Sequence, residues 1–432
     1  MPLRTQPAWR PAVALVLALT TAWSVGPSAP AAAATLTVTT TADELNSDGD
    51  CSLREAVRAA NTDAPVDACG AGVGADIVMI PVGTFTLSLT GSGDDAALTG
   101  DLDLLQPIVL VGSGRDATVI DGAGADRVLH VLSAGVALQG LTVRNGVSGG
   151  FSGAGIYIDN GALSAIGVSV VANTGNSAGI HVGSGSSLTL TEAIVAANSG
   201  ASAGGIFITS DATVVIERSL IIDNSVGFDG GGMNVRGNLT LINVTLSANL
   251  AQTDGGAILA DDATIRMFNT TITANTADVS GTGGDGGGLA LLGSTTVTTT
   301  NTLIAGNVDL SATGSVHPDC SGAVTSGGYT LLGDSTGCTL TAGAGDLAGV
   351  DPLVGALADN DGPTLTHALQ TGSPAIDAGD PSGCRVAAAV RLWLDQRGYG
   401  RINRCDIGAF EYGSNGEPLW LQLPSLANAA AP

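Results

Sequence analysis

The chain has 432 residues, of which 63 are glycine, while only 12% are charged and only 3% are aromatic. A globular core of this size would use more aromatic side chains, whereas small and β-branched residues with frequent glycine suit many short strands joined by tight turns. The formal net charge of −24, with no lysine among the 15 basic residues, argues against binding to nucleic acid or to anionic membranes.

The N-terminal 34 residues are predicted to be a secretory signal peptide. Arg4 and Arg10 form a positive region, residues 11–22 an apolar one, and residues 29–34 a small-residue site with cleavage expected after Ala34. The apolar run is shorter than the ~20 residues of a membrane-spanning helix, and no later segment reaches that length. We therefore expect an exported chain, extracellular or in the cell envelope, without a transmembrane segment.

Residues 35–75 are predicted to cap the N-terminal end of the fold. A strand over residues 35–40 leads through an acidic loop into a helix over residues 52–61, where Ser52 and Glu55 form a capping box. Leu53, Val57 and Ala60 fall on one face of this helix, which we expect to cover the first coil of the fold.

The acidic loop before this helix partly matches a calcium-binding loop template. The matching ligand positions are those of Glu44, Asn46, Asp48 and Glu55. Two features oppose calcium: the loop starts with Glu instead of Asp, and a strand precedes it instead of a helix. We therefore favour the alternative, an acidic turn leading to a disulfide, and calcium is the only cofactor that the sequence suggests.

An internal repeat sets the architecture of residues 76–350. Asparagine recurs in steps of 25, 26, 25, 26 and 32 residues, and positions ten, eight and three residues before it are apolar in every repeat except at Thr299. The period of two between the first two positions indicates a strand with one buried face, and glycine clusters mark further turns. The asparagines are Asn173, Asn198, Asn224, Asn249, Asn275 and Asn307.

This repeat predicts an all-β fold, a right-handed parallel β-helix of about ten coils with three strands and three turns in each. Val214, Leu239 and Ile265 should then stack in one buried row. Asparagine tolerates a left-handed backbone at a turn, and its amide can bond to the amide one coil away. We therefore expect an inward asparagine ladder; the alternative is a row of glycan-binding or glycosylated asparagines, since sequons occur at Asn238, Asn243 and Asn269.

Asp229, Asp254 and Asp285 form the best acidic column, just before the glycine clusters. Neighbouring coils would place their carboxylates about 5 Å apart, which suits a carbohydrate or divalent-ion site. The alternative, which we favour, is that aspartate before glycine is ordinary turn chemistry.

No catalytic residue is assigned. A lyase needs a basic residue beside its carboxylates, but the arginines of the coils are scattered. The four histidines share no spacing, so neither a zinc site nor a catalytic triad is predicted. The glycine-rich stretches lack the lysine of a phosphate loop.

Several motifs resemble known families of exported proteins. CSLREAVRAAN (51–61) is similar to the CSLREA motif at the start of bacterial β-helix proteins, and GGAILA with ITAN resembles chlamydial polymorphic outer-membrane protein repeats, although no Phe fills the FxxN position. Residues 351–412, with SPAIDAGD and CDIGAFEY, resemble the choice-of-anchor Q domain. The resemblance implies a surface or secreted protein of the pectin-lyase-like superfamily, generally without assigned activity. The tail, 413–432, carries no LPxTG sorting site.

Six cysteines remain after signal removal, which is an even number in an oxidising compartment. Fifteen connectivities are open. Because a solenoid brings together only residues close in sequence, we expect the local pairs Cys51–Cys69, Cys320–Cys338 and Cys384–Cys405.

Two functions follow as hypotheses. The first is a monomeric, adhesin-like or structural surface module without catalysis, which binds extracellular polysaccharide or cell-surface glycans. The alternative is a polysaccharide lyase or glycoside hydrolase, which would need a groove with convergent carboxylates and arginine.

Overall fold

The computed structural model describes residues 33–148, 153–281, 283–312, 314–387, 390–402 and 404–414. The predicted signal peptide, apart from its last two residues, and nearly all of the predicted tail lie outside these ranges. Within the described ranges, no helix is long and apolar enough to cross a membrane.

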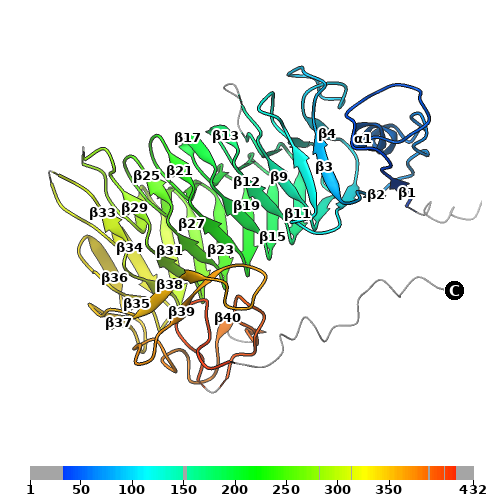
Figure 1. Ribbon diagram of the computed structural model, residues 1–432. Coiled ribbons are helices and arrows are strands. Elements are labelled where there is room, and N and C mark those ends of the chain that lie inside the picture. The colour runs from blue at the N-terminus through cyan, green and yellow to red at the C-terminus, as the bar shows by residue number, and fades with distance from the viewer. Residues whose placement is uncertain are drawn as a thin grey trace, which may run out of the picture. The chain divides into compact units, whose positions relative to one another are not determined.

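From Asp76 onward the chain winds into coils whose strands pair in parallel with those of the coils before and after (Figure 1). The strands of successive coils form four parallel sheets, numbered 1 to 4 in the order in which the chain passes through them within one coil. In the described residues, nine complete turns run from β2 to β34, close to the ten expected. The fold is a parallel β-helix, as the repeat predicts.

Sheets 1 and 2 form two walls of the coils. Sheet 1 comprises β1 (Thr35–Thr37), β2 (Asp76–Met79), β5 (Ile108–Val111), β8 (Val136–Gln139), β11 (Ala162–Ile166), β15 (Ser187–Thr191), β19 (Thr213–Glu217), β23 (Asn238–Ile242), β27 (Thr264–Phe268), β31 (Thr296–Thr300), β34 (Cys320–Ser326) and β36 (Cys338–Thr341). Sheet 2 comprises β3 (Gly83–Thr86), β6 (Thr118–Asp121), β9 (Thr142–Arg144), β12 (Ser169–Val171), β16 (Ile194–Ala196), β20 (Leu220–Ile222), β24 (Thr245–Ser247), β28 (Thr271–Thr273), β32 (Leu303–Ile304), β35 (Leu331–Leu332) and β37 (Leu347–Ala348).

Sheets 3 and 4 close each coil. Sheet 3 comprises β13 (Thr174–Ser177), β17 (Ser199–Ala203), β21 (Ser225–Val226), β25 (Leu250–Ala251), β29 (Thr276–Ala277) and β33 (Val308–Asp309). Sheet 4 comprises β4 (Leu102–Leu104), β7 (Leu129–Val131), β10 (Ile156–Ile158), β14 (Ile180–Val182), β18 (Ile206–Ile208), β22 (Met233–Val235), β26 (Ile258–Asp261) and β30 (Leu289–Leu292), and β34 extends it into sheet 1.

The expectation of three strands per coil is wrong where sheet 3 is present, because that sheet adds a fourth strand to the coil. The residues that follow each ladder asparagine stay extended and bond to the preceding coil, as when the Ser199 N–H donates to the Asn173 carbonyl over 2.9 Å. These strands are only two to five residues long because the glycine clusters turn the chain again. No hydrophobic alternation marks them, which is why the repeat pattern does not reveal them.

The core consists of inward rows, and the predicted register is confirmed. Val214 pairs with Leu239 and Leu239 with Ile265, and all three side chains are buried. The polar exception, Thr299, is also buried, where its hydroxyl bonds to that of Thr330 over 2.8 Å. Each coil therefore covers the apolar face of the next.

The six asparagines stack as an inward ladder in which the side-chain oxygen of each accepts from the asparagine one coil before it, except that Asn173 Oδ1 accepts from the Gly146 N–H. Asn198 Nδ2, for example, donates to Asn224 Oδ1 over 2.9 Å and to the Val170 carbonyl over 3.0 Å. We expected the asparagine itself to adopt the left-handed conformation. The structure instead places that conformation at the residue before it, such as Ala197 (φ 52°). The asparagine amide faces the core instead of solvent, so it replaces the missing strand bonds at this corner.

The glycine clusters lie directly against this ladder. A Cβ added at Gly205 would sit 2.4 Å from the Gly232 carbonyl oxygen and 3.1 Å from Asn224 Cγ. Glycine is required here because neighbouring coils approach too closely for a side chain.

At the N-terminal end, helix α1 (Leu53–Thr62) contacts the first coil. Its Ser52–Glu55 capping box is present, and Leu53, Val57 and Ala60 are buried. Arg54 is also fully buried, and its guanidinium pairs with Asp43 over 2.6 Å.

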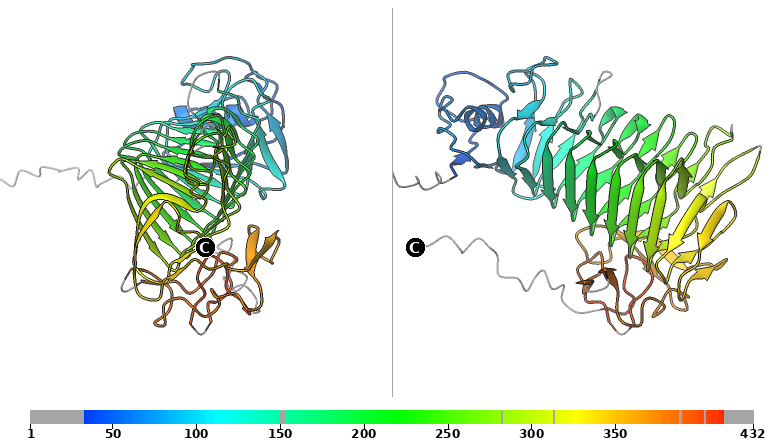
Figure 2. Two further views of the ribbon diagram at one scale, coloured as in Figure 1. Left: turned by 90° about the vertical axis from the view of Figure 1, so that its left-hand side faces the viewer. Right: turned by 180° about the vertical axis from the view of Figure 1, so that it is seen from behind.

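The C-terminal region runs back along the outer face of sheet 2, beside the later coils (Figure 2). It contains the antiparallel pairs β38 (Val354–Ala358) with β39 (Thr366–Leu369) and β40 (Arg385–Ala387) with β41 (Val390–Arg391). Thr245 donates to Gln396, Ser247 bonds to His367 and the Ala409 N–H donates to Thr271. The outward polar residues of this sheet are thus buried by the chain itself.

The cysteines form the three local disulfides Cys51–Cys69, Cys320–Cys338 and Cys384–Cys405. Two of the three sequons are buried: Asn243 donates to the Leu394 carbonyl, and Asn269 faces Cys384. Asn238 is exposed.

Candidate functional site

The outer face of sheet 4 carries a row of polar and aromatic side chains at one strand position. In β4, β7, β10, β14 and β18 the first and third residues point into the core, and the middle residue points outward. These middle residues pair coil to coil: Asp103, His130, Tyr157, His181 and Phe207. Asn234 continues the row in β22.

Neighbouring rings of this row contact one another along the helix axis. His130 and Tyr157 lie 5.1 Å apart at an interplanar angle of 9°, and His181 and Phe207 lie 5.0 Å apart at 17°. Between these two stacked pairs, Tyr157 and His181 meet edge to face, at 5.1 Å and 75°.

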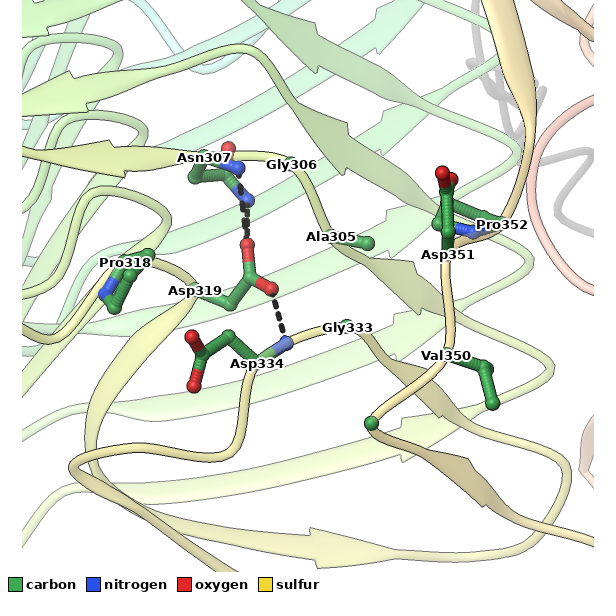
Figure 3. Close-up of a pocket in the computed structure, with 11 residues that line it drawn as sticks. Ala305, Gly306, Asn307, Pro318, Asp319, Gly333, Asp334, Val350, Asp351 and Pro352 are labelled. Atoms are coloured by element: carbon green, nitrogen blue, oxygen red, sulfur yellow. Dashed lines mark hydrogen bonds between the residues drawn. The ribbon is translucent and has the colours of Figure 1, made fainter.

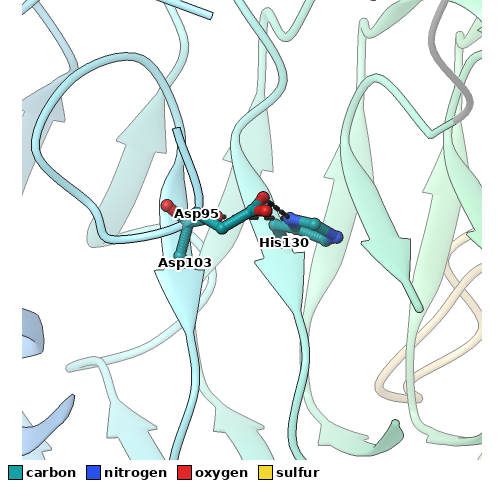
Figure 4. A group of neighbouring side chains, drawn as sticks. All are labelled: Asp95, Asp103 and His130. Atoms are coloured by element: carbon teal, nitrogen blue, oxygen red, sulfur yellow. Dashed lines mark hydrogen bonds and ion pairs between the residues drawn. The ribbon is translucent and has the colours of Figure 1, made fainter. Parts of the chain in front are cut away.

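His130 is the side chain on which charged groups converge (Figure 4). Its Nδ1 lies 3.2 Å from Asp103 Oδ1 and 3.6 Å from Asp95 Oδ1. The second oxygen of Asp103 accepts the Ala97 N–H over 2.7 Å, so that Oδ1 is directed at the imidazole. Asp103 and His130 are buried, whereas the Asp95 side chain is 71% exposed.

A cavity of about 210 Å³ opens beside this group. Two buried polar atoms of its lining side chains, His130 Nε2 and Asp126 Oδ2, have no hydrogen-bond partner in the described part of the chain. Such atoms are costly unless a ligand or water satisfies them. The cavity is lined by Gly93, Asp95, Asp126, Arg127, His130 and Tyr157.

Burial shifts the acidity of the groups around this cavity. It raises the pKa of Asp101 to about 6, although Arg127 Nε pairs with Asp101 over 2.6 Å and opposes the shift. Burial also raises the pKa of Asp126 and, together with the Asp159 carboxylate, the pKa of the Tyr157 hydroxyl. It lowers the pKa of His181 to about 4, so that histidine is neutral at neutral pH.

The aspartates predicted from the repeat lie elsewhere, at the turns between sheets 3 and 4. Asp229 accepts from the hydroxyl of Thr253 and from the Asp254 N–H, and Asp254 accepts from the Asp285 N–H over 2.7 Å. Each carboxylate is thus directed at the next turn. Asp285 faces His317 at 2.7 Å. This geometry favours the turn interpretation.

The predicted calcium residues fall into two groups instead of one, each with additional partners, and Glu55 keeps its capping bond to the Ser52 N–H. Carboxylate oxygens of Glu44, Asp48 and Asp50 lie within 4.8 Å of one another, and so do those of Asp50, Glu55 and Asp67. The two added residues, Asp50 and Asp67, fall outside the ligand positions of the template. Asn46 Nδ2 donates to Glu44 and to Asp48.

A larger cavity, of about 490 Å³, lies at the C-terminal end of the asparagine ladder (Figure 3). The buried Asp319 ends the ladder there, because its Oδ1 accepts from the N–H and Nδ2 of Asn307 and its Oδ2 from the Asp334 N–H over 2.6 Å. Both oxygens of Asp319 are engaged, so its role at this cavity is structural.

Sequence reasoning missed the sheet 4 row because the four histidines show no common spacing. The signal was the three-residue strand itself: LHV, IYI, IHV and IFI each place one ring between two apolar residues. His130 and His181 occupy the same strand position two coils apart, which corrects the view that the histidines are unrelated.

A family model described as "Right handed beta helix region" matches residues 128–340. This match covers just under half of the chain, so the coils are similar to a right-handed β-helix region. No curated protein matches the chain.

Among solved structures, this β-helix protein is similar to "pectate lyase Pel9A", at 15% identity over 88% of this chain and 96% of that chain, with a TM-score of 0.49. A second structure is "a mannuronic acid specific polysaccharide family 6 lyase enzyme from human gut microbiota", at 12% identity over 63% and 72% of the two chains, with a TM-score of 0.19.

Proposed function

We propose that this protein is an exported β-helix module that binds extracellular polysaccharide at the cavity beside His130 and acts in adhesion or surface structure. The observation that carries the proposal is the pair of buried, unpartnered atoms, His130 Nε2 and Asp126 Oδ2, at one small cavity of the described structure. Sugar hydroxyls both donate and accept hydrogen bonds, so one sugar could serve both atoms.

The charges at the cavity favour a neutral or amino sugar over a uronic acid. Asp95, Asp101, Asp103 and Asp126 surround a single arginine, Arg127, which is already paired with Asp101. A uronate carboxylate would meet like charges there, and the whole chain carries −24.

Export and surface location rest on the predicted signal peptide and on the three disulfides, which persist in oxidising compartments. The CSLREA and choice-of-anchor Q resemblances favour the same location. The means of attachment to a cell stays open.

The test is binding of the mature protein to a panel of neutral, amino-sugar and uronic-acid polysaccharides. We expect Asp126→Asn and Tyr157→Phe to weaken binding at least tenfold, and His181→Phe, on the same face but outside the cavity, to leave it unchanged. Absence of binding to every polysaccharide, or equal binding by all variants, would refute the proposal.

Cleavage of a polysaccharide is the second candidate, because Asp103 orients the His130 ring in the manner of a carboxylate–imidazole base. Incubation of the same panel with the protein, followed by assay of reducing and unsaturated ends, separates the two functions. Release of either kind of end that is lost in Asp103→Asn would replace binding by catalysis as the function.

A further inference from the structure

We propose that Asp95, Asp103 and His130 bind one divalent transition-metal ion, with one coordination position left open to the adjacent cavity. The inference lies at the cavity of the proposed function but goes beyond it, since it concerns an ion and can be measured without any sugar. The three ligand atoms all lie within 4.8 Å of one another.

The spacing of these atoms fits a metal centre. Zinc binds imidazole nitrogen and carboxylate oxygen at roughly 2.0–2.2 Å, so tetrahedral ligands are separated by roughly 3.3–3.6 Å. His130 Nδ1 lies 3.2 Å from Asp103 Oδ1 and 3.6 Å from Asp95 Oδ1. Two of the three separations are therefore close to those of a tetrahedral site, and the third, between the Asp95 and Asp103 oxygens, is within 4.8 Å.

The ligand set also suits such an ion. One imidazole and two carboxylates favour zinc and its first-row neighbours over calcium and magnesium, which prefer oxygen alone. Three protein ligands leave a fourth position for water or a ligand oxygen. The exposed Asp95 faces solvent, so the ion can enter from that side before this carboxylate closes over it.

The other nitrogen of His130 supplies an independent observation. The His130 residue is only 5% exposed, yet Nε2 has no partner among the described residues. An ion on Nδ1 fixes the ring proton on Nε2, where it becomes a donor for a ligand in the cavity. His181, at the same strand position two coils on, instead places its Nδ1 3.3 Å from the Ser177 hydroxyl and has no carboxylate pair.

Helix α1 holds the carboxylates in place. Arg54 donates to the carbonyls of Gly100 and Asp101, and Asn61 Nδ2 donates to the Asp103 carbonyl over 2.7 Å. Asp94 accepts the Ala96 and Thr99 N–H groups and so orders the turn that carries Asp95. A site on anchored backbone loses less entropy when an ion binds.

The experiment is calorimetric titration of the metal-stripped mature protein with Zn²⁺, repeated with Co²⁺ to read the coordination geometry from visible absorption. We expect one ion per chain with a tetrahedral Co²⁺ spectrum. Asp95→Asn, a surface change that should not affect folding, and Asp103→Asn should weaken binding at least tenfold. His181→Phe and Asp48→Asn, which alter the other histidine and the acidic loop, should bind as the wild type does.

The proposal would be overturned if Zn²⁺ did not bind stoichiometrically, or if Asp95→Asn left the binding unchanged. Asp103 and His130 would then be only a hydrogen-bonded pair. Polysaccharide binding measured with a chelator present separates the two proposals. Sugar binding without metal binding would refute the ion alone, and metal binding without sugar binding would refute the proposed function alone.

Discussion

At the scale of single residues, the asparagine ladder satisfies polar groups that the core would otherwise leave unpaired. Asn224 Oδ1 accepts both the backbone N–H and the Nδ2 of Asn198, while its own Nδ2 donates to the Val195 carbonyl and to Asn249 Oδ1. One side chain thus serves three coils.

Asn224→Ala should therefore be strongly destabilising. It removes the acceptor of the Asn198 N–H and of one Nδ2–H of Asn198 in the core, whereas Asn249 Oδ1 keeps the backbone N–H of residue 224, and the expected cost is about 2–4 kcal/mol. Thermal and urea unfolding measure it, with the exposed Asn238→Ala as control, for which we expect less than about 0.5 kcal/mol. Equal effects of the two changes would contradict the ladder's role.

His181 gives a pH dependence whose sign follows from its pKa. Burial lowers that pKa from 6.5 to about 4, so the unfolded chain binds more protons between these values. The stabilisation is present above pH 6.5 and is lost as pH falls to 4. His181→Phe keeps a ring at this position but cannot be protonated. The variant should therefore not show the fall of roughly 2–3 kcal/mol in the free energy of unfolding that acid pH causes in the wild type. Unfolding of both proteins at pH 7 and pH 4.5 tests this, and parallel losses would refute it.

At the scale of elements, α1 and the loop over residues 89–101 form one unit. Arg54 and Asp43 are a buried pair, and Asp43 also accepts the N–H groups of Ser88 and Leu89. The helix therefore reaches the candidate site through the loop that it holds.

Arg54→Ala should loosen this unit. Removal of one partner of a buried ion pair costs about 3 kcal/mol and leaves the loop carbonyls without donors. We expect faster hydrogen exchange over residues 89–101, whereas Arg58→Ala, which removes one exposed bond to Ala96, should have little effect. Unchanged exchange in Arg54→Ala would show that the loop is held by other contacts.

Calcium binding by the acidic loop before α1 stays a prediction. Burial and the neighbouring carboxylates raise the pKa values of Glu44 and Asp50, so the cluster favours a neutralising cation. Calcium should stabilise the fold by about 1–3 kcal/mol at saturating concentration and so raise the melting temperature, and a chelator should reverse this. Asp50→Asn should abolish the rise and the exposed Asp223→Asn should not; a rise that survives in Asp50→Asn would exclude the loop.

The sequence predicts what depends on local period and not what depends on the path of irregular segments. The rows through Leu239 and Ile265 follow from spacing alone, since a buried face must repeat at the length of a coil. The approach of Asp95 to His130 depends on a loop held by Arg54, which no period encodes. The sequence does not predict the stack of His130 on Tyr157, because the coils around these residues differ in length.

At the scale of the whole molecule, the C-terminal region determines what sheet 2 exposes. Thr245 and Ser247 flank the inward Leu246 in β24, and Gln396 and His367 cover them from the outer side of the sheet. Sequence resemblance predicts such a region over residues 351–412, whereas its position against the coils depends on contacts between residues more than 100 positions apart.

A chain that ends at residue 350 should consequently be less stable and should self-associate, because it uncovers this face and the apolar cluster around Phe410 and Leu303. Size-exclusion chromatography and dye binding test this. A chain that ends at residue 414, which keeps the described contacts, is the control. A monomeric, equally stable chain 33–350 would mean that the region is dispensable for the coils.

The coil-to-coil pairing has a mechanical consequence. Tension between the two ends of the stack acts on one set of rungs at a time, because the backbone bonds that join consecutive coils lie parallel to the pull. Opening one 25-residue coil releases roughly 80–90 Å of chain. Under load the stack should therefore lengthen coil by coil, in steps set by coil lengths of 25 to 32 residues.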